Sequence, residues 1–170
     1  ALARRHGMRP VIAGGAEAWL VATELAAAKA AVVLDPLVNL PASFDALGAR
    51  LDNAARLQRA GVVVVFSMTG LAPHFAHKVR QSAGNAVAHG MPWDAALAGL
   101  TANPAAVFGL GASRGRIETG MVADLVLWNG DPLEVTSAAD QVWVGGKPMS
   151  MRSRQTELLD RYLPQAARQP

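Results

Sequence analysis

The stretch Gly61-Val-Val-Val-Val-Phe66 decides the fold of this chain, because it is a short apolar run with four consecutive valines. Branched side chains suit the pleated surface of a strand, and an unbroken apolar run indicates a strand buried on both faces. Similar runs lie upstream, over residues 9–13 and 31–34. Alanine-rich segments that suit helices separate them, over residues 17–29 and 43–60. This alternation predicts a parallel sheet with helical crossovers.

Further elements are expected on both sides of residue 66. Ser43 is placed to cap the helix over residues 43–60, because its hydroxyl can accept from the amides of the first turn. Downstream, the pattern predicts helices over residues 79–88, 92–101 and 104–108, strands over 123–128 and 141–144, a hairpin turn over 144–147, and a terminal helix that ends near residue 163. The large aromatic side chains are expected in the core: Trp19, Trp93, Phe108 and Trp128.

The composition bounds the class of protein. The chain has 170 residues, of which 51% are hydrophobic and 17% are charged, which suits parallel strands covered by helices. No apolar run approaches the roughly 20 residues of a membrane span, so no membrane partner is expected. The net charge of +3 comes from scattered arginines without a basic stripe, which argues against a nucleic-acid partner. The absence of cysteine excludes disulfides and thiolate chemistry in this chain.

The C-terminal half carries a family resemblance. Residues 115–134, which begin Gly115-Arg-Ile-Glu-Thr-Gly120, and residues 141–147 together closely resemble the C-terminal signature of amidohydrolases. Upstream, residues 100–110 resemble the Thr-x-Asn-Pro-Ala helix that precedes this signature in the same family. Residues 9–90 resemble the last three strand–helix units of the barrel in the imidazolonepropionase-like and prolidase-like branch.

The resemblance implies an α/β fold, namely the C-terminal portion of a (β/α)8 barrel of the TIM type plus strands of a small β-sandwich domain. Residues 1–112 would form the last strand–helix units, residues 113–150 the sandwich segment, and residues 151–170 a helix and tail. The chain is then expected to be a truncated or partial one. Its partner would be the missing N-terminal half of the barrel or another copy in a homo-oligomer.

The resemblance also implies a hydrolase that acts on C–N bonds of a small-molecule substrate, such as an amide, a cyclic amide or a dipeptide. Enzymes of the family that this chain resembles use a metal, usually zinc, to activate water. The family draws ligands from a His-x-His on the first strand, a lysine or glutamate on the fourth and a histidine on the fifth. All of these would precede Ala1. Zinc or another divalent metal is therefore expected in the full-length family, and no metal ligand is predicted in this chain alone.

Two family positions that the chain does cover are altered. The sixth barrel strand typically ends in histidine followed by glycine, and Gly14 stands at the matching place. The eighth strand typically ends in Gly-Thr-Asp, and Thr69 stands where the aspartate, a proton shuttle, is expected. A threonine hydroxyl cannot act as the general base. These changes leave a second interpretation open, in which the protein is catalytically degenerate and has a binding or assembly role.

Two histidines are the catalytic candidates. His74 resembles a histidine of the family's Pro-His-Gly loop, and His77 lies three residues later. This pair could share a metal or, because an imidazole titrates near neutrality, serve as acid and base. The simpler alternative is that both are exposed residues of a loop or helix start.

Three residues are the candidates for substrate binding. Glu17, Asp35 and Thr69 each follow a predicted strand on the face where barrel enzymes bind substrates. The alternative for Glu17 is an acid at a helix N-terminus, where the helix dipole favours it. The alternative for Asp35 is structural capping of the loop that begins at Pro36.

Overall fold

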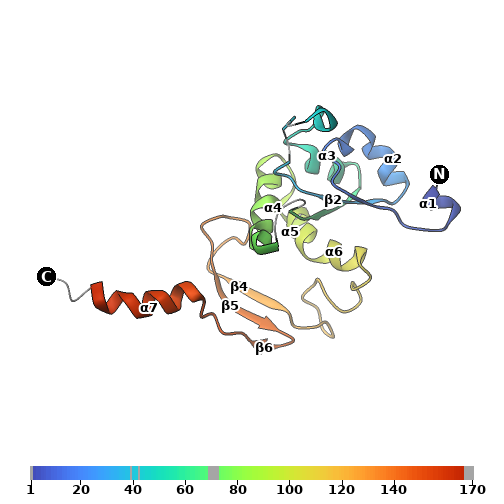
Figure 1. Ribbon diagram of the computed structural model, residues 1–170. Coiled ribbons are helices and arrows are strands. Elements are labelled where there is room, and N and C mark those ends of the chain that lie inside the picture. Colours follow the sequence, from blue (N-terminus) through green and yellow to red (C-terminus); the bar gives the residue numbers. More distant parts are fainter. Residues whose placement is uncertain (1, 39, 42, 69–72, 167–170) are drawn as a thin grey trace.

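The computed structural model describes residues 2–38, 40–41, 43–68 and 73–166. It is a mixed α/β structure with two small sheets, each of three strands (Figure 1). The first half of the chain consists of α1 (Leu2–Arg5), β1 (Val11–Ala13), η1 (Ala18–Val21), α2 (Ala22–Ala27), β2 (Ala31–Leu34), η2 (Phe44–Ala46), α3 (Asn53–Arg59), β3 (Val63–Phe66) and η3 (Pro73–Lys78). The second half consists of α4 (Val79–Ala88), α5 (Trp93–Leu100), α6 (Ala102–Val107), β4 (Leu125–Trp128), β5 (Ala139–Val144), β6 (Lys147–Pro148) and α7 (Arg154–Ala166).

The strands β1, β2 and β3 form a parallel sheet in that order, as the sequence predicts. Their register places Ile12 beside Val32 and Val32 beside Val64. Val32 and Val64 are fully buried, and burial of one such side chain stabilises the fold by about 1.5–3 kcal/mol. The outer strand β1 is exposed along its whole length. Within the described residues, this edge of the sheet is therefore open.

The helices between these strands are shorter than predicted. Residues 17–29 form the 3-10 helix η1 followed by α2, and residues 43–60 hold only η2 and α3. The prediction of a continuous helix over 43–60 was wrong, because residues 47–52 are not helical. Ser43 makes no side-chain capping hydrogen bond. The physical reason is that Gly48 is hydrogen-bonded to the segment that follows β1, which holds this loop out of a helix.

Helices α5 and α6 pack against β3. A Cβ atom at Gly99 would lie 2.8 Å from the ring of Phe66, so glycine permits the close approach of α5. From α6, the Asn103 side chain donates to the Val64 carbonyl at 2.9 Å. The asparagine of the Asn-Pro-Ala motif thus satisfies a backbone acceptor of the sheet, which explains why the motif carries a polar residue there.

The strands β4, β5 and β6 form an antiparallel sheet. Both predicted strands and the hairpin turn are confirmed, with strand ends that differ by two residues. Gly145 and Gly146 have φ angles of 56° and 78°, the left-handed values that a two-residue hairpin loop requires. The register shifts between Leu127 and Trp128, which marks a β-bulge.

The loop between β4 and β5 docks on α4. Leu133 is 5% exposed and belongs to the same core as β2 and β3. A Cβ atom at Gly84 would collide with the backbone carbonyl oxygen of Leu133. From the same helix, Arg80 donates to the carbonyls of Pro132 at 3.1 Å and Ser137 at 2.8 Å. These contacts join the antiparallel sheet to the helices that cover the parallel one.

Two aromatic side chains expected in the core lie at the surface. Trp93 is 41% exposed and its indole Nε1 donates to the Asp131 carboxylate at 2.9 Å. Phe108 is 65% exposed and lines a groove of about 880 Å³ formed by α5, α6 and β4. The core prediction was wrong for these two residues, because the hydrogen bond to Asp131 holds the Trp93 indole at the surface, and the groove leaves Phe108 uncovered.

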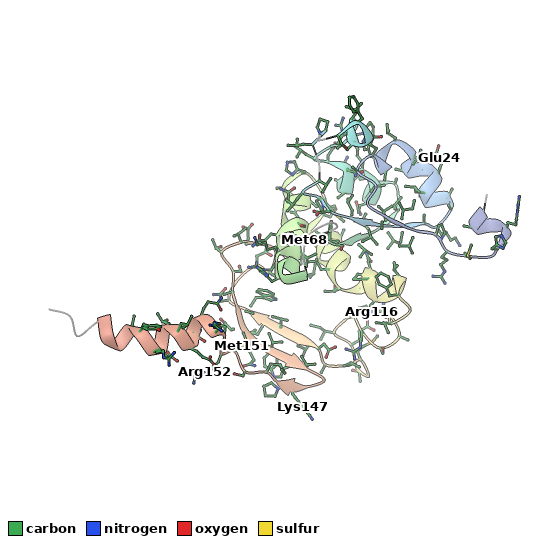
Figure 2. The ribbon with its side chains drawn as sticks, viewed as in Figure 1. Glu24, Met68, Arg116, Lys147, Met151 and Arg152 are labelled. Atoms are coloured by element: carbon green, nitrogen blue, oxygen red, sulfur yellow. The ribbon has the colours of Figure 1, made fainter. Side chains whose placement is uncertain are left out.

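Helix α7 projects away from both sheets (Figure 1). Figure 2 shows Met151 and Arg152 where the chain enters this helix, beyond Lys147 at the end of the antiparallel sheet. Its apolar side chains are exposed: Leu158, Leu159, Tyr162 and Leu163. Among the described residues, no helix is long and apolar enough to cross a membrane.

Candidate functional site

The carboxyl ends of the three parallel strands meet at one end of the sheet. Gly14 follows β1, Asp35 follows β2 and Ser67 follows β3, and these three residues are called the strand-end site below. The amide of Gly14 donates to the Val33 carbonyl at 2.9 Å, and the amide of Ser67 donates to the Leu34 carbonyl at 3.0 Å. The main chain therefore remains paired up to this site. Met68, labelled in Figure 2, marks where the chain leaves β3.

Asp35 is the buried acid of the strand-end site, with 4% of its surface exposed. Its Oδ1 atom accepts from the amide of Leu37 at 3.0 Å, and its carbonyl accepts from the amide of Val38 at 3.0 Å. Burial raises the pKa of the Asp35 carboxyl, and the hydrogen bond from Leu37 opposes that shift. Within the described residues, no cationic side chain forms an ion pair with this carboxylate.

The raised pKa of Asp35 predicts a pH-dependent stability. Ionisation of a group whose pKa is higher in the folded state costs stability as pH rises through the interval between the unfolded and folded values. The substitution Asp35→Asn removes this cost and keeps an acceptor for Leu37. We expect it to raise the free energy of unfolding at neutral pH, and the gain to vanish below about pH 4. Urea denaturation at both pH values measures this, and an equal effect at both would contradict it.

The backbone after β1 has a conformation suited to glycine. Gly14 and Gly15 have φ angles of 92° and 77°, in the left-handed region that side chains disfavour. A Cβ atom at Gly14 would meet no atom within 4 Å, so there is open space beside it. The obstacle to a histidine at this position is therefore backbone strain and not crowding.

Glu17 lies on the segment after β1, as predicted, but its carboxylate is hydrogen-bonded within the fold. Its Oε1 atom accepts from the amide of Gly48. Beside it, Trp19 Nε1 donates to the carbonyl of Gly48 at 2.7 Å. The guanidinium groups of Arg50 and Arg56 lie 5.1 and 5.2 Å from the centre of the Trp19 ring. These contacts fasten the loop that contains Gly48 to the segment after β1.

Asn53 is a residue of the site region that the sequence did not single out. Its Nδ2 atom donates to the carbonyls of Gly15 and Ala16, both at 3.0 Å, and its Oδ1 atom accepts from the amide of Trp19 at 3.1 Å. The side chain is 4% exposed. A buried amide with three bonds to one loop fixes the position of that loop. In the sequence, Asn53 falls inside the helix predicted over residues 43–60, so no local pattern distinguishes it.

The predicted histidines lie on η3. His77 is exposed there. The side chain of His74 and the whole of Thr69 lie outside the described residues. Within the part of the chain that is described, no group of three histidine, aspartate or glutamate side chains could hold a metal ion.

Comparison with known proteins gives consistent matches. A family model described as "Amidohydrolase family" matches residues 51–149. The chain is 47% identical over 58 residues to the amidohydrolase tasK of Hapsidospora irregularis, a match that covers 34% of this chain and 6% of that protein. The structure of an amidohydrolase from Thermotoga maritima MSB8 is similar with a TM-score of 0.78 and 30% identity, over 89% of this chain and 39% of the other.

A structure of an adenosine deaminase from Xanthomonas campestris with bound zinc is similar in fold, with a TM-score of 0.61 and 21% identity. That match covers 98% of this chain and 45% of the other. The chain thus spans less than half the length of these solved structures and 6% of the curated relative. Because the family model matches more than half of its residues, the chain belongs to the amidohydrolase family.

Proposed function

We propose that this chain is the C-terminal part of a hydrolase that acts on C–N bonds of small molecules, such as amides, cyclic amides or dipeptides. The observation that carries the proposal is that this chain, a member of the amidohydrolase family, has its strand-end site where three parallel strands end together. Barrel enzymes place their active sites at the carboxyl ends of parallel strands, and here Gly14, Asp35 and Ser67 meet at that end.

In this proposal the parallel sheet is the last part of a (β/α)8 barrel formed by residues 1–112. The antiparallel sheet, with residues 113–150, belongs to a small β-sandwich, and residues 151–170 are a terminal helix and tail. The open edge of β1 supports the barrel assignment, because an exposed strand edge favours pairing with another strand. The missing N-terminal half, or a second copy of this chain, would supply that strand.

The residues proposed for chemistry are those that the sequence predicted. His74 and His77 on η3 exchange protons with the substrate, and Glu17, Asp35 and Thr69 contact it. Asp35 has the strongest support among these, because it is buried at the centre of the strand-end site. The support for Glu17 is weaker, since its carboxylate already accepts from Gly48.

The described residues do not fit the zinc site of the family. They offer no cluster of three ligands, and Gly14 has a left-handed φ at the position where the family has histidine. A metal bound in the manner of the family therefore needs ligands from outside the described residues.

A catalytically degenerate protein with a binding or assembly role is the second candidate function. The backbone at Gly14 favours it, because recovery of a histidine ligand there requires a change of main-chain conformation as well as of side chain. Metal binding distinguishes the two candidates. An enzyme with rearranged ligands binds a metal that supports hydrolysis, and a degenerate protein does not.

Metal content by elemental analysis, with an assay of amide and dipeptide hydrolysis, tests the proposal. We expect about one zinc or other divalent ion per chain, and hydrolysis that chelation abolishes, in the longest natural form of the protein. The 170-residue chain alone is expected to bind none. A folded, metal-free and inactive long form would contradict the hydrolase and support the binding or assembly role.

A further inference from the structure

The carboxylate of Asp35 has no charge partner in the part of the chain that the structure describes. It is 4% exposed and lies on the central strand of the parallel sheet. Burial of a carboxylate without an opposite charge is unfavourable, and proteins usually place a cation beside it. Among the described residues, the hydrogen bond to this carboxylate comes from the neutral amide of Leu37. A counter-charge from outside the chain would therefore be bound favourably.

The structural role of Asp35 does not require its charge. The side chain accepts from the amide two residues later, which is the geometry of a turn that asparagine forms as well as aspartate. The neutral amide would serve this turn without the cost of burying a charge. The local fold therefore needs an acceptor at this position but does not need the negative charge of Asp35.

The two chain ends beside Asp35 carry small groups only. Because β2 is the central strand, Asp35 is flanked by the chain ends at Gly14 and Ser67. Gly14 contributes no side chain, and a Cβ atom there would meet nothing within 4 Å. Ser67 contributes a hydroxyl that is only partly buried.

We propose that Asp35 forms an anionic subsite that binds a positively charged amino or guanidino group of the ligand. This inference rests on the proposed function, since it names a chemical class of substrate for the same site. Charge-assisted N–H hydrogen bonds to a carboxylate are the strong kind, and a planar guanidinium can donate two of them in parallel.

The test compares two probes of nearly equal shape, methylguanidinium and methylurea, in titrations of the whole chain followed by amide NMR shifts. We expect saturable shifts at Gly14, Leu37 and Ser67 with methylguanidinium, and binding of methylurea at least about tenfold weaker. The substitution Asp35→Asn should weaken methylguanidinium binding by a similar factor. The control Asp140→Asn removes the same charge from an exposed position on β5 and should leave binding unchanged.

Equal binding of the two probes, no saturable binding of either, or full binding by the Asp35→Asn variant would overturn the inference. Failure of the proposed function gives a different result. Hydrolysis of neutral and cationic amides at equal rates would leave the hydrolase standing and remove the subsite. Selective binding of methylguanidinium by this chain, together with a folded, metal-free and inactive long form of the protein, would keep the subsite and contradict the hydrolase.

Discussion

Replacement of Gly84 by alanine is expected to lower the free energy of unfolding by about 2–3 kcal/mol, although alanine is normally the better helix former by about 1 kcal/mol. Gly84 lies in the middle of α4, and a Cβ atom there would collide with the backbone carbonyl oxygen of Leu133. No change of rotamer can relieve this clash, because the obstructing atom belongs to the main chain. Either the helix or the docked loop must move.

The loss should be largest where the loop meets α4. Arg80 would lose its bonds to the Pro132 and Ser137 carbonyls, and its guanidinium, 5.0 Å from the centre of the Trp128 ring, would move. Urea denaturation gives the total effect. Hydrogen exchange of residues 129–138 shows whether the loop opens before the parallel sheet does.

The matched control exchanges the same two residue types in the same helix. Ala88 is exposed at the end of α4, so Ala88→Gly should cost less than about 1 kcal/mol, through helix propensity alone. A Gly84→Ala variant as stable as the wild type would show that the loop does not pack on α4 as described.

The sequence was informative where structure depends on local pattern. The valines of residues 62–65 predicted a buried parallel strand, and the strand is confirmed, although Val63 is 42% exposed. Gly145 with Gly146 predicted the hairpin, because its tight turn needs left-handed φ values. The helix over residues 43–60 was predicted wrongly for the opposite reason. Its interruption depends on hydrogen bonds of Gly48 to residues 29 and 31 positions earlier, and no local pattern reports such a partner.

The strand-end site also combines features that the local sequence predicts with features that depend on distant contacts. The position of Asp35 at a strand end was predictable from the apolar run that precedes it. Its burial and raised pKa were not, because they depend on what packs around it. The family resemblance predicts that Gly14 stands in the place of a histidine, whereas its left-handed φ is a property of the folded loop.

Replacement of Asn53 by alanine is expected to cost about 3 kcal/mol, since it leaves three partly buried backbone groups without their partner. These are the carbonyls of Gly15 and Ala16 and the amide of Trp19. The three bonds come from one side chain and all reach the segment after β1, so their loss should free that segment as a unit. Urea denaturation measures the cost, and the NMR signal of the Trp19 indole N–H reports the movement of the segment.

Two further variants decide whether the amide itself holds the segment. Asn53→Asp keeps the acceptor for Trp19 but places a carboxylate against two carbonyls, so its cost should match that of alanine and fall on acidification. Asn129→Ala removes an exposed asparagine that accepts from Ala138, and should cost less than about 1 kcal/mol. Because Gly14 lies beside the segment that Asn53 fixes, Asn53→Ala should also weaken ligand binding at the strand-end site. An Asn53→Ala variant as stable as Asn129→Ala would show that the segment holds its place without this side chain.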